Sequence, residues 1–397
     1  MKKILIICTK YPLAQNSTWL TRELAEELQG RGYEVDVVCI DWSKTSTRQE
    51  LKLNNINIYN TTSIGMNSGG FFNFIVKWIG SSVYAALCAS KYIFKRHDLV
   101  IGFSPCVSSW FLILLSKIFS KKSLLIYWDF FPIHQVEINL IKGKTKEKAL
   151  KIFEKVLVNL FDYVGCMSPK NCKFLEKYFG VRSKKSFELP IWSEDLPPTL
   201  NFDKTENEFP YINDESIYFI FGGQIDYGRG VECILEAARL AHEKNNKVKT
   251  IVIGRGRFTD KVIAEANNEG SGVIYSDHIS RESYLKLVSF CRAGIIATVP
   301  NVSVPTYPSK SLDYMKLGLP VIASIESTTD FGEIIQNSDA GLCCSAGNAD
   351  ELATSMLFLA ENAEVASIKG KNANALFKAR HEVKKVVSNL LNSINEA

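Results

Sequence analysis

The feature that most constrains the fold is a regular alternation of short apolar runs with longer amphipathic segments. Between the first two runs, Leu20, Leu24 and Leu28 recur every four residues with charged residues on the other face, which is typical of a helix packed on one side. Because the segments alternate and tight hairpin turns are lacking, we expect a parallel, doubly wound sheet. The strands expected in the first half are Ile4–Cys8, Glu34–Ile40, Leu99–Phe103, Leu124–Trp128, Tyr163–Met167 and Ser186–Leu189.

A proline-rich stretch at 190–214 interrupts this alternation, which then resumes. Because 397 residues exceed one typical domain, we expect an α/β protein with two domains, each containing a doubly wound sheet. The expected domains are 1–195 and 196–375, followed by a C-terminal helix at 376–397 that is able to return to the first domain. Further expected helices are 71–95, 106–119, 145–161, 168–179, 231–243, 258–267, 282–289 and 309–316, and further strands are 217–221, 250–253, 272–275, 294–297 and 321–323.

The composition is that of a soluble globular protein, with 46% hydrophobic and 22% charged residues. Residues 1–200 hold 27 basic and 17 acidic residues, whereas residues 201–397 hold 20 and 25. A basic first half predicts contact with an anionic surface. The ten cysteines form no C-x-x-C pair, which favours buried thiols in a reducing cytosol. The apolar start, Met1–Cys8, is too short for a signal peptide, and we expect a cytoplasmic protein without a transmembrane helix.

Two glycine-rich segments follow expected strands of the second half. In the first, Phe221–Gly230, four glycines allow the backbone to approach a phosphate, and Arg229 is able to bind the phosphate oxygens. The second, Gly254–Arg257, is a weaker G-x-G pattern. The alternative for both segments is a tight turn with a surface arginine.

A third segment, Tyr307–Ile322, predicts a turn, a short helix and a buried strand. Ser309 has the side chain of a helix cap, and Lys310 beside the first helical amides favours an anion. Asp313, one turn deeper, is placed to accept hydrogen bonds from ribose hydroxyls. The alternative is an ordinary capped helix with a solvated Lys and Asp.

These three segments together resemble the donor site of the retaining, nucleotide-sugar-dependent glycosyltransferases of the GT-B architecture, specifically glycosyltransferase family 4. The resemblance implies two Rossmann-like domains that face a central cleft. The resemblance implies that Asp313 takes the place of the ribose-binding Glu of the family, and that Gly223–Gly230 takes the place of its phosphate loop. The donor-binding residues implied are Gly223, Gln224, Arg229, Gly254, Ser309, Lys310 and Asp313. The sequence has no D-x-D motif, so we expect neither a metal ion nor another cofactor.

The first half resembles a surface-polysaccharide branch of the same family more loosely. The segment Trp128–Pro132 is similar to its Asp-Leu-Trp-Pro segment, and Leu189–Trp192 is similar to a later landmark. Asp129 directly follows an expected strand and His134 lies five residues on, so both are candidates for contact with the acceptor or the sugar. The alternatives are a turn residue for Asp129 and a packed or surface histidine for His134.

The sequence departs from the family at several positions. Gln224 replaces the usual phosphate-binding Arg, and Pro305 replaces a Glu that reads the donor sugar, so the identity of the sugar does not carry over. The loop after the first strand lacks the common Gly-Gly pair. It offers three polar residues on the acceptor side instead, which are Asn16, Ser17 and Thr18. These losses also fit an inactive relative.

The resemblance implies transfer of a sugar, with retention, to a glycan or a lipid-linked acceptor of surface polysaccharide synthesis, and we expect the donor to be UDP-linked. Arg229 and Lys310 would stabilise the leaving diphosphate, which itself helps to deprotonate the acceptor. The catalytic candidates are therefore Asp129, His134, Arg229 and Lys310. The alternatives are a nucleotide-sugar 2-epimerase of the same fold and a non-catalytic nucleotide-sugar or glycan-binding relative.

Aromatic and basic residues gather in three segments of the first half, which are Phe71–Ile79, Trp110–Lys122 and Lys142–Lys151. Helices of this composition lie in membrane interfaces, so we expect peripheral contact with the anionic inner face of the plasma membrane. The alternative is core-facing helices with solvated lysines. No nucleic-acid reader motif is recognisable, and we expect no nucleic-acid partner.

Overall fold

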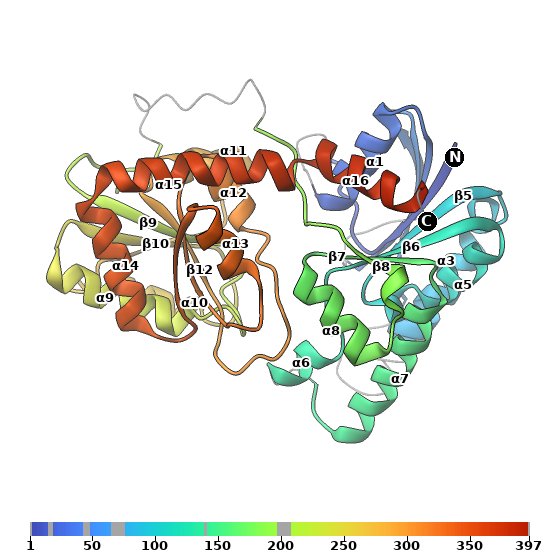
Figure 1. Ribbon diagram of the computed structural model, residues 1–397, viewed down its shortest axis with the longest axis horizontal. Helices are drawn as coiled ribbons and strands as arrows, with labels where there is room; N and C mark the ends of the chain where they lie inside the picture. The colour runs from blue at the N-terminus through green and yellow to red at the C-terminus, as the bar shows by residue number, and fades with distance from the viewer. Residues whose placement is uncertain are drawn as a thin grey trace. The chain divides into compact units, whose positions relative to one another are not determined.

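The computed structural model describes residues 2–14, 19–42, 48–64, 76–138, 141–196 and 208–395. The chain divides into two compact units, each built around a sheet of mostly parallel strands (Figure 1). The first unit comprises Met1–Glu194 together with Val383–Ala397, and the second comprises Asp195–Glu382. The predicted α/β class with two doubly wound domains is confirmed.

The first unit contains an eight-stranded sheet with the order β3-β4-β2-β1-β5-β6-β7-β8 among the described residues. All neighbouring strands run parallel except β3 and β4. The strands are β1 (Lys3–Cys8), β2 (Glu34–Asp41), β3 (Gln49–Leu53), β4 (Ile56–Thr62), β5 (His97–Phe103), β6 (Ser120–Tyr127), β7 (Tyr163–Cys166) and β8 (Ser186–Glu188).

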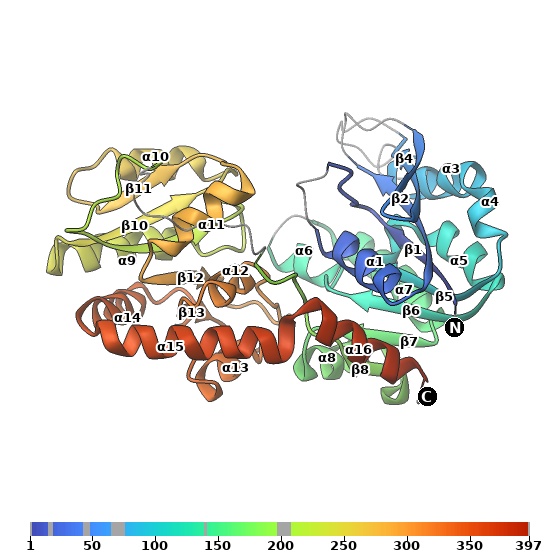
Figure 2. The ribbon, with the colours of Figure 1, turned by 90° about the horizontal axis from the view of Figure 1, so that it is seen from above.

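Helices cover both faces of this sheet. Crossovers between parallel strands are right-handed, so strands added on one side of β1 place their helices on one face and strands added on the other side place theirs on the opposite face. On one face α1 packs against α16, whereas α3, α4 and α5 lie on the other side of the strands (Figure 2). The helices are α1 (Leu20–Gly30), η1 (Val76–Gly80), α3 (Ser81–Cys88), α4 (Ser90–Ile93), η2 (Cys106–Ser108), α5 (Trp110–Ile118), α6 (Ile133–Glu137), α7 (Lys144–Leu160), α8 (Pro169–Phe179), η3 (Ser183–Lys185) and α16 (Val383–Asn395).

The second unit contains a six-stranded, wholly parallel sheet with the order β11-β10-β9-β12-β13-β14. Its strands are β9 (Ile217–Gly222), β10 (Val248–Ile253), β11 (Val273–Ser276), β12 (Ala293–Ala297), β13 (Val321–Ile325) and β14 (Gly341–Ser345). Its helices are α9 (Val231–Lys244), α10 (Thr259–Ala266), α11 (Arg281–Ser289), α12 (Ser311–Lys316), α13 (Phe331–Asn337), α14 (Ala349–Glu361), α15 (Ala363–Leu376) and η4 (Phe377–His381).

The expectation that hairpins are lacking is wrong at β3 and β4, which form an antiparallel pair. The turn between them consists of Asn54 and Asn55, with φ angles of 49° and 63°. Asparagine tolerates this left-handed region and suits a two-residue hairpin turn. The expected helix 71–95 is also corrected to η1, α3 and α4 over 76–93, and its first five residues lie outside the described part of the chain. The strand β14 and the helices α6 and α13 were not expected.

The expected helix at 376–397 is corrected as well, since α16 begins only at Val383. The π-helical turn η4 ends at His381, and Glu382 then adopts an extended conformation. The amide of Val383 donates to the Ser193 carbonyl at 3.1 Å. Helix α16 buries its apolar face in the core of the first unit through Val386 and Leu390, among other residues. Among the described residues, no helix is long and apolar enough to cross a membrane.

A buried carboxylate holds the turn after β5. Glu154 of α7 is inaccessible to solvent. Its oxygens accept hydrogen bonds from the backbone amides of Cys106 at 2.7 Å and Val107 at 3.1 Å. Burial raises the pKa of Glu154 to about 7, although these two amides act in the opposite direction. The same buried group thus orders η2 and makes the first unit sensitive to pH.

We expect Glu154 to make stability fall as the pH rises. Its pKa in the folded chain exceeds the ordinary 4.5, so the stability that it contributes is complete below pH 4.5 and is lost on the way to about pH 7. The loss is of the order of 3 kcal/mol. Urea unfolding over this pH range should show that loss in the wild type and not in Glu154→Gln. Parallel pH profiles for the two proteins would contradict the expectation.

Candidate functional site

The candidate site lies where the strand order of the second unit reverses. Strand β9 is flanked by β10, which follows it in sequence, and by β12, which is added on the opposite side. Loops at the carboxyl ends of strands diverge at such a point, which is where open α/β sheets bind ligands. The loops that leave β9 and β12 hold Gly223–Gly230 and the segment up to Lys310, respectively.

Two glycine-rich loops press against each other at this edge. A Cβ atom added to Gly254 would lie 1.9 Å from the Gly223 carbonyl oxygen, and one added to Gly256 would lie 2.1 Å from the Ile225 carbonyl oxygen. The amide of Ile225 donates to the Arg255 carbonyl at 3.1 Å. The G-x-G pattern is therefore explained by close packing of two backbones, and Gly254 supports the β9 loop from behind.

Lys310 places a buried ammonium group in the candidate site. Its side chain reaches back over β9, with Nζ 3.6 Å from the centroid of the Phe221 ring. The ammonium nitrogen is buried, and no described residue accepts a hydrogen bond from it. A Cβ on Gly223 would lie 3.5 Å from that nitrogen, so the ammonium faces the glycine loop. A buried cation without an acceptor is costly, and an anion at this point would remove the cost.

Arg229 adds a second positive charge to the same loop. Burial, and secondarily the charge of Arg229, hold the pKa of Lys310 well below its ordinary value. Arg229 is half-buried, and its amide donates to the Asp226 carbonyl at 3.3 Å. Gln224 and Gly223 are exposed, and Gly223 has a φ angle of 121°. The geometry thus assembles two cations and an open backbone at one strand end.

Ser309 does not cap a helix as expected. Helix α12 begins at Ser311, its N-cap residue is Lys310, and no side chain caps it. The hydroxyl of Ser311 donates to the Pro308 carbonyl at 2.7 Å instead. Ser309 is exposed beside Lys310, so its predicted role in donor binding stays a prediction.

Asp313 is already engaged by two cations. Its Oδ2 accepts from Arg281 Nη1 at 2.6 Å, its Oδ1 accepts from Nη2 of the same guanidinium, and Lys316 Nζ lies 3.4 Å from Oδ1. Burial alone would raise the pKa of Asp313, but Arg281 and Lys316 outweigh it and hold the pKa below its ordinary value. The carboxylate is therefore charged and fixed in orientation.

The two arginines of the second glycine segment have acidic partners of their own. Arg255 forms a two-pronged ion pair with Asp277, and Arg257 Nε lies 3.7 Å from Asp226 Oδ1. Both arginines are largely exposed. Their charges are partly neutralised, so Lys310, whose nitrogen has no acceptor among the described residues, is the stronger candidate for binding an anion.

In the first unit, Asp129 and His134 lie on the segment that follows β6. The Oγ atom of Ser104, at the end of β5, accepts the amides of Trp128 at 2.8 Å and Asp129 at 2.9 Å. Asp129 is exposed, and the half-buried His134 lies on α6 with its amide donating to the Phe130 carbonyl at 3.0 Å. Ser104 thus fixes the backbone that presents Asp129. The acceptor-side candidates Asn16, Ser17 and Thr18 lie outside the described residues.

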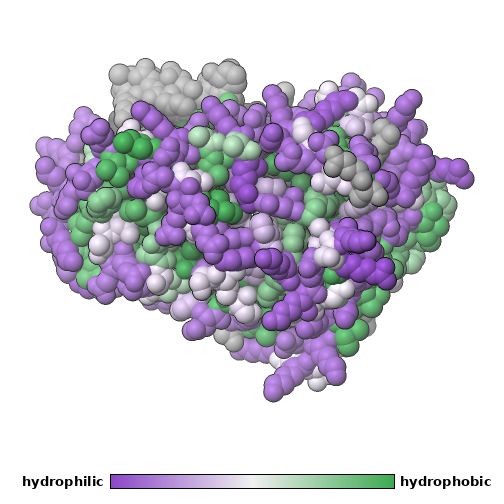
Figure 3. Space-filling view, viewed as in Figure 1, coloured by the Kyte–Doolittle hydropathy of each residue, from purple (hydrophilic) through white to green (hydrophobic). Residues whose placement is uncertain are grey.

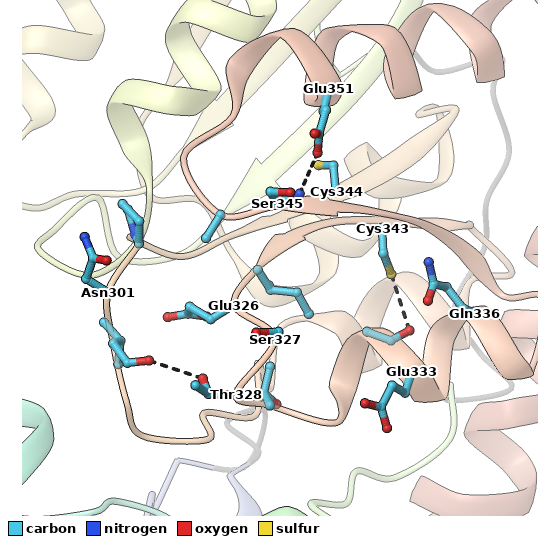
Figure 4. Close-up of a pocket in the computed structure, with 16 residues that line it drawn as sticks. Asn301, Glu326, Ser327, Thr328, Glu333, Gln336, Cys343, Cys344, Ser345 and Glu351 are labelled. Carbon is cyan, nitrogen blue, oxygen red and sulfur yellow. Dashed lines mark hydrogen bonds between the residues drawn. The ribbon is translucent and has the colours of Figure 1, made fainter.

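A cavity of about 610 Å³ lies beyond β12, β13 and β14, and it does not contain the predicted donor residues. Its lining includes Asn301, Glu326, Glu333 and Glu351 (Figure 4). None of the described residues that line it is Lys or Arg. Glu326 accepts a hydrogen bond from the Thr298 hydroxyl at 2.6 Å. The acidic side chains of the lining give the cavity negative charge, which disfavours a diphosphate.

Three supporting residues escaped the sequence analysis. Arg281 begins an amphipathic helix and looks like a surface residue, Phe221 ends an apolar strand, and Ser104 stands in an uncharged run. Each acts across at least 24 residues of chain, on Asp313, Lys310 and Asp129, respectively. The sequence offers one signal for a supporting role, which is a position at the end of an expected strand. Phe221 and Ser104 have it, and Arg281 does not.

Residues 216–362 match the family described as "Glycosyl transferases group 1". An uncharacterized glycosyltransferase of Methanocaldococcus jannaschii is 24% identical over 285 residues, which cover 69% of this chain and 68% of that protein. The matched family segment lies wholly in the second unit and contains the candidate site.

Solved structures resemble the whole chain. Sucrose-phosphate synthase from Thermosynechococcus elongatus has a TM-score of 0.74 at 15% identity and covers 100% of this chain and 99% of its own. HepE from Anabaena, in complex with UDP and glucose, has a TM-score of 0.69 at 13% identity and covers 100% of both chains. These likenesses show a fold of two Rossmann-like domains of the GT-B architecture. Together with the family match they support a glycosyltransferase.

We expect Lys310→Met to weaken nucleotide binding and to stabilise the free protein. Loss of the ammonium removes a charge-assisted bond to phosphate, which corresponds to a roughly 10- to 100-fold weaker affinity for UDP. It also removes a buried charge without an acceptor, so the free energy of unfolding should rise by about 1 kcal/mol. Calorimetric titration with UDP and urea unfolding measure the two effects.

Lys371→Met, at an exposed position on α15, is the matched control and should change neither quantity. The affinity of the wild type for UDP should also fall as the pH rises through the lowered pKa of Lys310, because an anion binds the charged form. A destabilised Lys310→Met protein with unchanged UDP affinity would contradict this account of the site.

Proposed function

We propose that this chain is a retaining glycosyltransferase of family 4 that transfers a sugar from a UDP-linked donor to a lipid-linked glycan of surface polysaccharide synthesis. The observation that carries the proposal is the buried Lys310 ammonium, which faces the Gly223 loop without an acceptor among the described residues. It lies at the strand-order reversal of a segment that matches glycosyl transferases group 1. A diphosphate is the ligand that supplies the missing acceptor oxygens.

The charges of the site favour a nucleoside diphosphate over a neutral ligand. Lys310 and Arg229 bind the phosphate oxygens, and the exposed backbone of Gly223 allows their close approach. Because HepE, a structure of the same fold, was solved with UDP, we take UDP as the nucleotide. Two protein cations at this point make a metal ion unnecessary.

The Asp313 carboxylate binds the ribose hydroxyls of the nucleotide. A carboxylate has about four lone-pair sites. Arg281 occupies two of them through its fork and Lys316 lies 3.4 Å from Oδ1, which leaves at least one site for a ribose hydroxyl. Arg281 and Lys316 keep the carboxyl ionised, which strengthens a hydrogen bond donated by a hydroxyl.

The transfer itself needs little covalent chemistry from the protein. The bond from the anomeric carbon to the leaving phosphate breaks, a bond to the acceptor oxygen forms on the same face, and the acceptor proton passes to that phosphate. Lys310 and Arg229 stabilise the charge that develops on the diphosphate. Asp129 and His134 orient the acceptor hydroxyl, and Ser104 holds the backbone of Asp129.

The ribose assignment predicts a contrast between two acids of the second unit. Asp313→Asn should weaken UDP binding by about tenfold or more, because the asparagine amide lacks the negative charge of the carboxylate that Arg281 holds in place. Glu326→Gln, in the neighbouring acidic cavity, should leave UDP affinity within about twofold, since Glu326 bonds Thr298 and not the donor site. Equal losses from the two substitutions would refute the assignment.

A donor-turnover assay tests the activity. UDP release from UDP-sugars should rise when a polyprenyl-diphosphate-linked acceptor is added, and it should persist in EDTA because Lys310 and Arg229 supply the positive charge. Conversion of the donor sugar to its 2-epimer without acceptor would replace the proposal with an epimerase. Tight UDP binding without turnover of any donor would indicate a non-catalytic binding protein.

A further inference from the structure

Exposed apolar side chains gather on one layer of helices in the first unit. Leu87 on α3 is 70% exposed, Phe94 directly after α4 is 56%, Ile118 on α5 is 72%, and Ile152 and Val156 on α7 are 54% each. Figure 3 shows hydrophobic surface along the edge where these helices lie. The exposed apolar residues of the second unit stand on separate elements, with Tyr227 in the loop after β9 and Ile263, Phe358 and Ile368 on three different helices. Scattered residues are ordinary, whereas a gathered set indicates an interaction surface.

The helices of this layer are neighbours, so their exposed residues share one side. The amide of Phe111 donates to the Ser82 hydroxyl at 3.0 Å, which places α5 beside α3. The rings of Trp110 and Phe153 lie 5.9 Å apart, which places α5 beside α7. We call the outer side of α3, α4, α5 and α7 the docking face.

The charge of the docking face is strongly one-sided. Helices α3, α4 and α5 contain no Asp or Glu, and α7 contains only Glu147 and the buried Glu154. The exposed basic residues of the face include Arg96 and four lysines of α7, which are Lys144, Lys146, Lys148 and Lys155. On these helices the apolar and basic residues thus occur together without exposed acids. In the described part of the chain, exposed acids of neighbouring segments pair with only two of the basic residues of these helices, as Glu50 does with Lys91 of α4 and Asp162 with Lys117 of α5.

The structure also changes what the sequence indicated. Of the segment Trp110–Lys122, Leu112 and Ile113 are buried in the core, and Ile118 is its most exposed apolar residue. The expected segment Phe71–Ile79 lies outside the described residues up to position 75. The exposed surface is therefore a composite of four helices, whereas the sequence indicated three separate segments.

We propose that the docking face binds the surface of an anionic lipid bilayer. The lysine and arginine ammonium and guanidinium groups reach the lipid phosphates while their stems and the neighbouring apolar side chains enter the interface. A second copy of this chain does not fit, because a two-fold contact would place the α7 lysines of one copy against those of the other. The proposal does not depend on the transferase activity.

Vesicle sedimentation with the full chain tests the proposal. The wild type should bind vesicles that contain phosphatidylglycerol more tightly than vesicles of phosphatidylcholine, and added salt should weaken the binding. The triple variant Leu87→Ser, Ile118→Ser, Ile152→Ser should partition about tenfold less. Each of Lys148→Gln and Lys155→Gln should cost about fivefold.

The matched control is Ile263→Ser, Phe358→Ser, Ile368→Ser, which changes three exposed but less accessible apolar residues of the second unit and should partition like the wild type. Thermal unfolding of every variant checks that the units remain folded. Equal partitioning of the two triple variants would overturn the proposal. So would a wild-type dimer, in the absence of vesicles, that the docking-face variant converts to a monomer, because the occupant would then be a second copy.

Discussion

The interaction on which the candidate site depends is the burial of a lysine ammonium against an aromatic ring. The Lys310 nitrogen lies over Phe221, the last large residue of β9, and its pKa is lowered because burial and Arg229 both disfavour its charge. The attraction of the ring only partly offsets that cost. The glycine loop lies beside this nitrogen, so the residue whose buried charge is costly in the free protein is the one that we propose as a ligand of the donor phosphate.

The supports of the site come from the backbone as much as from charged side chains. Gly254 lies so close to the Gly223 carbonyl that any side chain there would push the β9 loop out of position. In the first unit, the hydroxyl of Ser104 accepts two successive amides and fixes the loop that presents Asp129. Both units thus position functional side chains through loops at the carboxyl ends of parallel strands, which is the common rule of open α/β sheets.

Much of the fold was predictable because strand and helix periods differ clearly in a chain whose strands are buried on both faces. The β3–β4 hairpin was missed because its strands are partly exposed and its turn uses Asn54 and Asn55 rather than glycine. In the candidate site, the glycines and Lys310 were proposed from the motifs of the sequence, and their roles in donor binding stay predictions. The Arg281–Asp313 pair and the Phe221–Lys310 contact join residues 32 and 89 positions apart, so only the tertiary structure brings them to light.

The order of the chain has a consequence for its synthesis. Helix α16, the last helix, fills the core of the unit whose first strand is β1, so Val386 and Leu390 pack with side chains that emerged from the ribosome hundreds of residues earlier. The amino-terminal unit therefore remains incomplete while the whole second unit is being made. Its exposed apolar core needs protection during that interval, and a chain without α16 would lack part of the core of the unit that was translated first.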